Sequence, residues 1–217
     1  PSVYLKNLME LGIVSRELSV DAGQREKSNS SRGTYRLTDN FFRFWYAFGF
    51  ANISQLEDGD VEGGYRYMVE PNLHQFASFV FEDICREFVR ELQKRGRLPF
   101  WYTKMGLWTG MTTVRYLGAR IGLRLSETEI DLLAIGQGAK QYLVGECKFR
   151  KSPFSFSDYL DTVAKLTPQK GQAEFFYALF SESGFEPKVQ AEASDHVFLY
   201  DLGEIVNLEF PGDNPTD

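Results

Sequence analysis

The sequence predicts an α/β fold, with a sheet covered by helices on both faces and a smaller helix-and-hairpin segment before it. Apolar residues recur every three or four positions over 71–95, which is typical of an amphipathic helix. Nearly continuous apolar runs over 129–135 and 141–148 are typical of strands that are buried on both faces. Shorter runs at 13–18 and 34–39, on either side of a polar stretch, predict a hairpin.

The composition is that of a globular protein. Of the 217 residues, 43% are hydrophobic and 25% are charged, close to ordinary soluble usage. No run approaches the roughly 18 apolar residues that a membrane helix needs. Two cysteines, Cys85 and Cys147, cannot build a disulfide framework and lack zinc-site spacing. We therefore expect a cytoplasmic protein with reduced thiols and no membrane contact.

The first fifty residues predict a separate unit. Apolar spacing over 3–11 favours a helix that Gly12 ends, and a strand, a long polar tip and a returning strand follow. This is the order of the last helix and wing of a winged helix, although an ordinary structural hairpin has the same order. Asp39 can cap a connecting helix over 40–50, where seven of eleven residues are aromatic. Such a segment must pack against another part of the protein or a partner, and self-association is one such use.

The remaining elements form the predicted main domain. A polar, glycine-containing stretch predicts a linker, so the expected domains are 1–50, 51–70 as linker, and 71–210. The helix that begins at Pro71 ends in basic residues before Gly96, and it carries Glu82 beside its apolar stripe. The stretches 98–108 and 112–123 are strand-like or loop-like, and 129–135 and 141–148 form the pair of strands already named. Further patterns predict a helix, a strand, a short helix, a final strand and a frayed tail, at 157–166, 173–180, 186–194, 196–202 and 211–217.

Charge is distributed unevenly along the chain. The formal net charge is -6, yet residues 94–151 hold 11 Lys and Arg against 4 Asp and Glu. Residues 1–93 hold 10 against 14, and residues 152–217 hold 3 against 12. Because a phosphate backbone responds to local positive potential, the middle segment is the predicted place for nucleic-acid contact. Uneven charge is also common in acidic proteins without such a partner.

Three charged residues interrupt the apolar strand runs. Glu146 and Lys148 are two residues apart, so their side chains leave the strand on one face. A hairpin that turns at 136–140 can bring Asp131 beside Glu146. Two close carboxylates repel each other unless a cation lies between them, and Mg²⁺ or Mn²⁺ takes such oxygen ligands. The trio therefore predicts a metal site for phosphodiester hydrolysis, in which the backbone carbonyl of Cys147 completes the ligands and Lys148 stabilises developing negative charge. A cross-strand ion-pair network is the structural alternative.

Asp131 and the Glu146-Cys147-Lys148 triplet, with Glu82 on an upstream helix, resemble the PD-(D/E)XK nuclease superfamily. More closely, the words "FVFEDICREFV", "GLWTG", "EIDLLAIG" and "VGECKF" look like the C-terminal domain of archaeal-type DEXX-box ATPases. The resemblance implies a restriction-endonuclease-like mixed sheet flanked by helices, after a winged helix and an upstream P-loop ATPase domain. It also implies that Asp131 and Glu146 bind metal, Lys148 assists the water, and Glu82 acts as an additional ligand or holds a water.

Two departures from the family pattern concern Ile130, where the family has proline, and the motif around Trp108, which lacks an expected arginine and second tryptophan. Arg150 and Lys151 follow the charged strand and are predicted to contact DNA phosphate; a solvated strand end is the alternative. The 217 residues contain no Walker motif, so any ATPase activity belongs to other sequence.

The sequence leaves three functions open. The first is a magnesium- or manganese-dependent DNA endonuclease domain. The second is a non-catalytic module that binds DNA or protein and regulates an upstream ATPase. The third is a DNA-binding winged helix with a degenerate nuclease fold, which binds DNA in a salt-dependent way without cleaving it.

Overall fold

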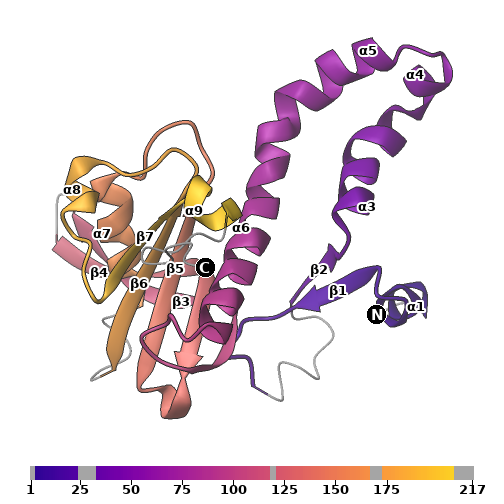
Figure 1. Ribbon diagram of the computed structural model, residues 1–217. Helices are drawn as coiled ribbons and strands as arrows, with labels where there is room; N and C mark the ends of the chain where they lie inside the picture. Colours follow the sequence, from indigo (N-terminus) through magenta and orange to yellow (C-terminus); the bar gives the residue numbers. More distant parts are fainter. Residues whose placement is uncertain (1–2, 24–32, 118–120, 167–172, 208–217) are drawn as a thin grey trace, which may run out of the picture. The chain divides into compact units, whose positions relative to one another are not determined.

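The computed structural model describes residues 3–23, 33–117, 121–166 and 173–207 (Figure 1). It is a mixed α/β protein with a small antiparallel sheet before a larger mixed one, which confirms the predicted fold class. The chain divides into two compact units, the first with residues up to Leu18 and Ala22–Val80, the second with Ser19–Asp21 and everything from Phe81. Within the described residues, no helix has the length and apolar character that crossing a bilayer requires.

The first unit begins with the predicted helix and hairpin. Its elements are α1 (Val3–Glu10), β1 (Val14–Glu17), β2 (Thr34–Leu37), α3 (Asn40–Phe44), the π-helix η1 (Trp45–Gly49), the 3-10 helix η2 (Phe50–Asn52), α4 (Ile53–Glu57), α5 (Val61–Gly64), the π-helix η3 (Tyr65–Val69) and the start of α6 (Glu70–Lys94). Gly12 follows α1 with a φ of 71°, the left-handed conformation expected at a helix end. Strands β1 and β2 pair antiparallel, while the predicted tip at 24–32 lies outside the described residues.

The aromatic segment forms the predicted helix, but most of its rings stay exposed: Phe41, Phe42, Phe44, Tyr46 and Phe50. The Asp39 carboxylate caps α3 by accepting hydrogen bonds from the N–H groups of Phe41 and Phe42, at 2.7 and 3.2 Å. One turn later, Phe44 and Phe48 pack edge-on against Phe76 of α6, with ring centroids 5.8 and 5.5 Å apart. These ring contacts give Phe44 and Phe48 a partner within the chain, whereas the expected packing of the other exposed rings stays a prediction.

Residues 51–70, expected to be a linker, are mostly helical. The chain turns at Gly59, whose φ is 83°, and Asp60 then caps α5 by accepting a hydrogen bond from the Gly63 N–H at 3.0 Å. From there α5, η3 and α6 follow without an intervening loop. The polar composition of this stretch thus reflects helix ends and solvent-facing positions, and the two units divide at 80/81, inside α6.

The second unit is built on one five-stranded sheet. Its further elements are β3 (Tyr102–Leu117), β4 (Ile121–Gly136), the 3-10 turn η4 (Gln137–Ala139), β5 (Gln141–Lys148), α7 (Phe156–Ala164), β6 (Glu174–Ser181), α8 (Pro187–Gln190), β7 (Val197–Asp201) and α9 (Leu202–Asn207). The strand order is β3-β4-β5-β6-β7, antiparallel from β3 to β5 and parallel from β5 to β7. The parallel pairs need crossover connections, which carry α7 and α8.

Helices cover this sheet on both faces (Figure 1). On one face, Phe81, Cys85 and Phe88 of α6 pack with Leu132 and Leu143 of the sheet. The other face has its own cluster, in which residues around α7 and α8 pack on the strands. This second cluster includes Leu133, Val144, Phe154, Leu166, Leu179 and Val189. The central strands are therefore buried on both faces, as their nearly continuous apolar runs predict.

Trp108 holds a distant piece of chain against the edge strand β3. Its indole Nε1–H donates a hydrogen bond to Asp21 Oδ2 at 2.8 Å, and the Val20 N–H donates to the Leu107 carbonyl at 2.8 Å. The indole is buried, and a Cβ on Gly110 would lie 2.6 Å from its ring, so Gly110 makes room for it. The motif around Trp108 thus anchors residues 19–21 to the sheet, a role that sequence reasoning did not identify.

We expect Trp108→Phe to lower the free energy of unfolding by about 2 kcal/mol, because it removes the hydrogen bond to the Asp21 carboxylate and part of a buried ring. A thermal or urea melt measures the loss. Trp101→Phe is the matched control, since Trp101 is 69% exposed and its change should have little effect. Equal stability of the two variants would contradict the anchoring role.

Candidate functional site

The antiparallel pairing of β4 and β5 brings Asp131 to Glu146. Leu132 lies opposite Gly145 in the ladder, so the next pair outward is Asp131 and Glu146. The Cys147 N–H donates a hydrogen bond to Asp131 Oδ2 at 2.8 Å. Asp131 and Glu146 each lie two residues from a member of the cluster around α7, Leu133 and Val144 respectively. Glu146 therefore lies on the sheet face that α7 covers, and the Asp131 carboxylate lies beside it at the end of the β4–β5 ladder, where it accepts the Cys147 N–H.

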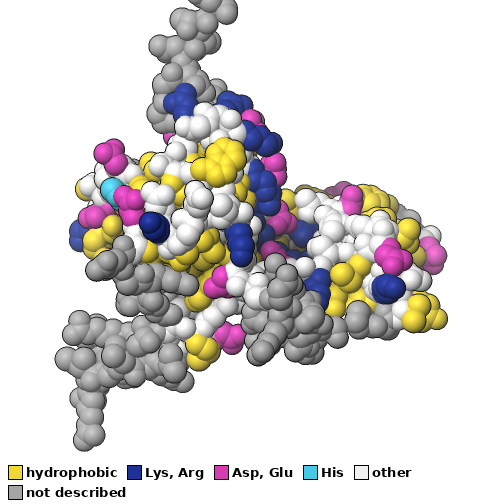
Figure 2. All heavy atoms as spheres, turned by 90° about the horizontal axis from the view of Figure 1, so that it is seen from below, with side chains coloured by type: hydrophobic (Ala, Val, Ile, Leu, Met, Phe, Trp, Pro, Cys, Tyr) yellow, Lys and Arg dark blue, Asp and Glu magenta, His cyan; other side chains and the backbone are white. Residues whose placement is uncertain are grey.

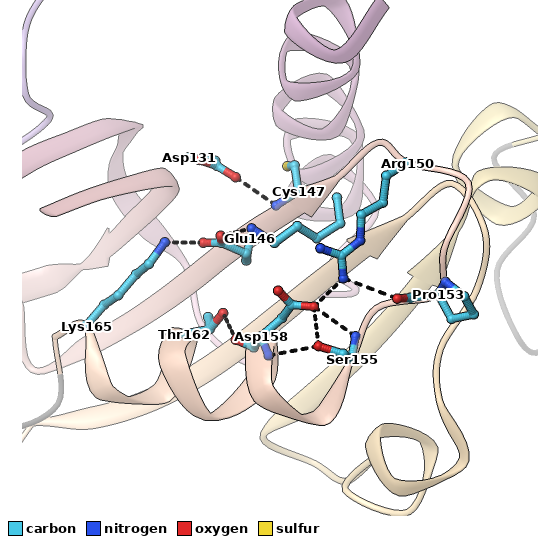
Figure 3. Close-up of polar contacts among 10 residues, drawn as sticks. Asp131, Glu146, Cys147, Arg150, Pro153, Ser155, Asp158, Thr162 and Lys165 are labelled. Carbon is cyan, nitrogen blue, oxygen red and sulfur yellow. Dashed lines mark hydrogen bonds and ion pairs between the residues drawn. The ribbon is translucent and has the colours of Figure 1, made fainter. Parts of the chain in front are cut away.

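Glu146 is held by two ammonium groups (Figure 3). Lys148 Nζ lies 2.6 Å from Oε1, and Lys165 Nζ, from the end of α7, lies 2.5 Å from Oε2. The Glu146 side chain is only 7% exposed. The predicted trio of Asp131, Glu146 and Lys148 therefore converges, and a second lysine that the sequence analysis did not select joins it.

The two carboxylates differ in electrostatic environment. Burial, and then the negative charge of Glu146, raise the pKa of Asp131 to about 6, although the Cys147 N–H and both lysines act in the opposite direction. Burial opposes the charged form of Lys148 as well, but the charge and hydrogen bond of Glu146 and the charge of Asp131 raise the pKa of this lysine above its usual value. Glu146 is thus fully ion-paired, whereas Asp131 has no salt bridge to a described residue.

Glu82 and Arg86 approach the same strand from α6. The buried Arg86 guanidinium donates from Nε to the Asp131 backbone carbonyl at 3.0 Å. It also pairs with Glu82 Oε2 at 3.3 Å and Asp83 Oδ1 at 2.9 Å. Arg86 therefore connects the predicted Glu82 to the β4 backbone beside the site. The role of Glu82 as a further metal ligand stays a prediction.

Binding of a divalent cation by Asp131 and Glu146 stays a prediction. Among the described residues, no three His, Cys, Asp or Glu side chains lie close enough to share one ion. Mg²⁺ does not require three, since it is commonly bound through one or two carboxylates and keeps several waters. Asp131 and Glu146 lie beside each other as such carboxylates, and the Cys147 carbonyl stays a predicted third ligand.

Arg150 fastens the start of α7. Its guanidinium pairs with the Asp158 carboxylate and donates to the Pro153 carbonyl at 3.2 Å. Ser155 and Asp158 form a capping box at the N-terminus of this helix. Burial works to raise the pKa of Asp158, but the hydroxyl and N–H of Ser155, together with Arg150, lower it. Arg150 thus has a structural role, while Lys151 is exposed. Contact of either with DNA phosphate stays a prediction.

The basic middle segment does not form a purely positive surface in the described residues. On the face shown in Figure 2, Asp and Glu side chains lie among the Lys and Arg side chains. At the end of α6, Lys94 and Arg95 both pair with Glu91 at 3.2 Å. Local pairing therefore offsets part of the charge excess counted over 94–151.

Lys165 is the main site residue that the sequence analysis missed. It lies 19 residues after Glu146, at the C-terminal cap of α7, in the stretch predicted only as a helix. The signal that could have found it is its place in the connection after β5. A helix that links two parallel strands packs on a face of their sheet, so its basic end can reach a carboxylate on that face.

Comparisons with known proteins place the chain among archaeal and bacterial sequences. Residues 45–160 match the profile of DUF234, described as archaea bacterial proteins of unknown function. The "Uncharacterized protein MJECL04" of Methanocaldococcus jannaschii is 32% identical over 149 residues, 68% of this chain and 28% of that protein. The chain thus spans less than a third of this curated relative. A crystal structure titled "Crystal Structure of Protein of Unknown Function AF1548" aligns with a TM-score of 0.32 and 18% identity, over 55% of this chain and 58% of that one.

Proposed function

Because the chain belongs to the DUF234 family, which corresponds to the C-terminal domain of DEXX-box ATPases, we propose that its second unit is a metal-dependent DNA endonuclease domain. The single observation that carries this proposal is the convergence of Asp131, Glu146 and Lys148 at the end of the β4–β5 ladder. In this proposal the unit cleaves DNA with the residues that resemble the PD-(D/E)XK motif. DNA and an upstream ATPase domain are the proposed partners.

Each residue has a distinct task in this proposal. Asp131 and Glu146 hold Mg²⁺ or Mn²⁺, which when bound supplies Lewis acidity to a phosphoryl oxygen and makes a water easier to deprotonate. Lys148, 2.6 Å from Glu146, keeps a positive charge where negative charge develops on the phosphoryl group. The Cys147 N–H fixes the orientation of the Asp131 carboxylate through the 2.8 Å hydrogen bond. Arg86 steadies the same strand from the opposite side, through the Asp131 carbonyl.

The test is a nicking assay on supercoiled, linear and single-stranded DNA with Mg²⁺ or Mn²⁺. We expect nicking by the wild-type chain and a loss of about 100-fold or more in Lys148→Ala, since it removes an electrostatic stabiliser of the transition state. Lys188→Ala, at an exposed position of α8, is the matched control and should keep full activity. Nicking that survives both Asp131→Ala and Lys148→Ala would exclude the proposed site.

A non-catalytic module is the second candidate, and one observation favours it. Both oxygens of Glu146 are already engaged by ammonium groups, which is the arrangement of a structural ion-pair network. In that case the unit binds DNA or protein and regulates an ATPase domain elsewhere in the protein. Calorimetric titration with Mn²⁺ separates the candidates, because the module predicts the same absence of binding in the wild type and in Asp131→Asn.

A further inference from the structure

Four charged groups in the site balance one another. Asp131 and Glu146 contribute two negative charges, and Lys148 and Lys165 contribute two positive ones. Their sum is zero without any metal ion. A divalent cation added to this set leaves an excess of two positive charges in a largely buried place, which is electrostatically unfavourable.

The two lysines differ in how firmly the fold holds them. Lys148 lies on β5, two residues from Glu146, so its ammonium group shares the face of its partner wherever the strand is formed. Lys165 is instead the C-cap residue of α7, where its backbone N–H donates to the Thr162 carbonyl at 3.2 Å. Its long side chain, 20% exposed, reaches Glu146 from the helix end. Rotation of that side chain can release Glu146 Oε2 without moving the sheet or the helix.

We propose that Lys165 is an internal counter-cation that occupies the Glu146 carboxylate in place of a divalent ion and must leave before the ion binds. This inference rests on the proposed metal site and adds its regulation. The Lys165 ammonium group keeps the buried carboxylate neutralised while the site is without metal. It also weakens metal binding, because the ion has to displace an ion pair. Lys148 remains in place after the displacement and supplies the positive charge next to the phosphoryl group.

The test is calorimetric titration of Mn²⁺ into four forms of the chain at neutral pH. We expect Lys165→Gln to bind Mn²⁺ about 10-fold more tightly than the wild type, because a positive charge next to the ion is removed. Lys165→Arg keeps the charge and should bind as weakly as the wild type. Lys188→Gln loses an exposed lysine of α8 and should also match the wild type. Thermal melts of all four forms check that each is folded.

The outcomes separate the two proposals. Tighter binding by Lys165→Gln alone, or binding by this variant where the wild type shows none, supports the counter-cation. If the wild type binds Mn²⁺ and Lys165→Gln binds it equally or more weakly, the counter-cation is overturned and the metal site stands. If no folded form binds Mn²⁺, the metal site itself is overturned, and Lys165 is then part of a permanent ion-pair network.

Discussion

Replacing Glu146 with glutamine is expected to lower the free energy of unfolding by about 2–4 kcal/mol, because it leaves two ammonium groups without their buried anion. Lys148 and Lys165 lie 2.6 and 2.5 Å from its two oxygens. Both lysines are partly exposed, so they can turn toward water after the substitution. The expected loss in free energy of unfolding is therefore smaller than for a fully buried ion pair. Urea unfolding in the presence of a chelator measures it.

Two comparisons sharpen the Glu146 experiment. Glu174→Gln is the matched control on the neighbouring strand β6, where the carboxylate is exposed and contacts Gln141 and His196, so we expect a much smaller change. The double variant Glu146→Gln/Lys165→Gln should recover about 1 kcal/mol of the loss, because it removes one of the unpaired cations. A Glu146→Gln protein as stable as the control would contradict the ion-paired geometry.

Asp131→Asn is expected to have the opposite sign and to stabilise the metal-free protein by about 2 kcal/mol at neutral pH. Burial and the Glu146 charge raise the pKa of Asp131 to about 6, from an ordinary value of 3.8. The folded chain therefore binds this proton more tightly than the unfolded chain, and wild-type stability falls as pH rises from about 4 to about 6. Asparagine carries no charge, and its carbonyl oxygen can still accept the Cys147 N–H.

Urea unfolding of both proteins across this pH range measures the Asp131 effect. The difference in stability should be near zero below about pH 4, where the carboxyl is protonated in both states, and should reach its full value above about pH 6. A variant less stable than the wild type at neutral pH would mean that Asp131 is paired. With saturating Mn²⁺, the proposed site predicts that the wild type gains stability by mass action while Asp131→Asn does not.

The opposite signs expected for these two neighbouring carboxylates follow from their partners. Glu146 is expected to stabilise the fold through its two lysines, whereas Asp131 is expected to destabilise the metal-free protein. A residue that destabilises the fold while it lies in a cluster of charged groups is a common feature of functional sites. The variants Glu146→Gln and Asp131→Asn therefore distinguish a metal-binding site from an ion-pair network that only stabilises the fold.

The sequence by itself determined the elements and the trio. Period-two spacing placed Glu146 and Lys148 on one face, the turn at 136–140 brought Asp131 back to them, and apolar spacing after Pro71 predicted α6. These features depend on residues close in sequence, where backbone geometry allows few arrangements. The sequence did not predict that the glycine-containing stretch 51–70 is mostly helical, because polar composition suits exposed helices as well as a linker.

Only the tertiary structure decided which charges compensate the site. Lys165 reaches Glu146 from the end of α7, Arg86 reaches the Asp131 carbonyl from α6, and Asp21 reaches the Trp108 indole across 87 residues of sequence. Each of these contacts depends on which face of the sheet an element covers and on how far a long side chain extends. Spacing along the chain does not encode either quantity, so the partners of the buried carboxylates became visible only after the sheet was assembled.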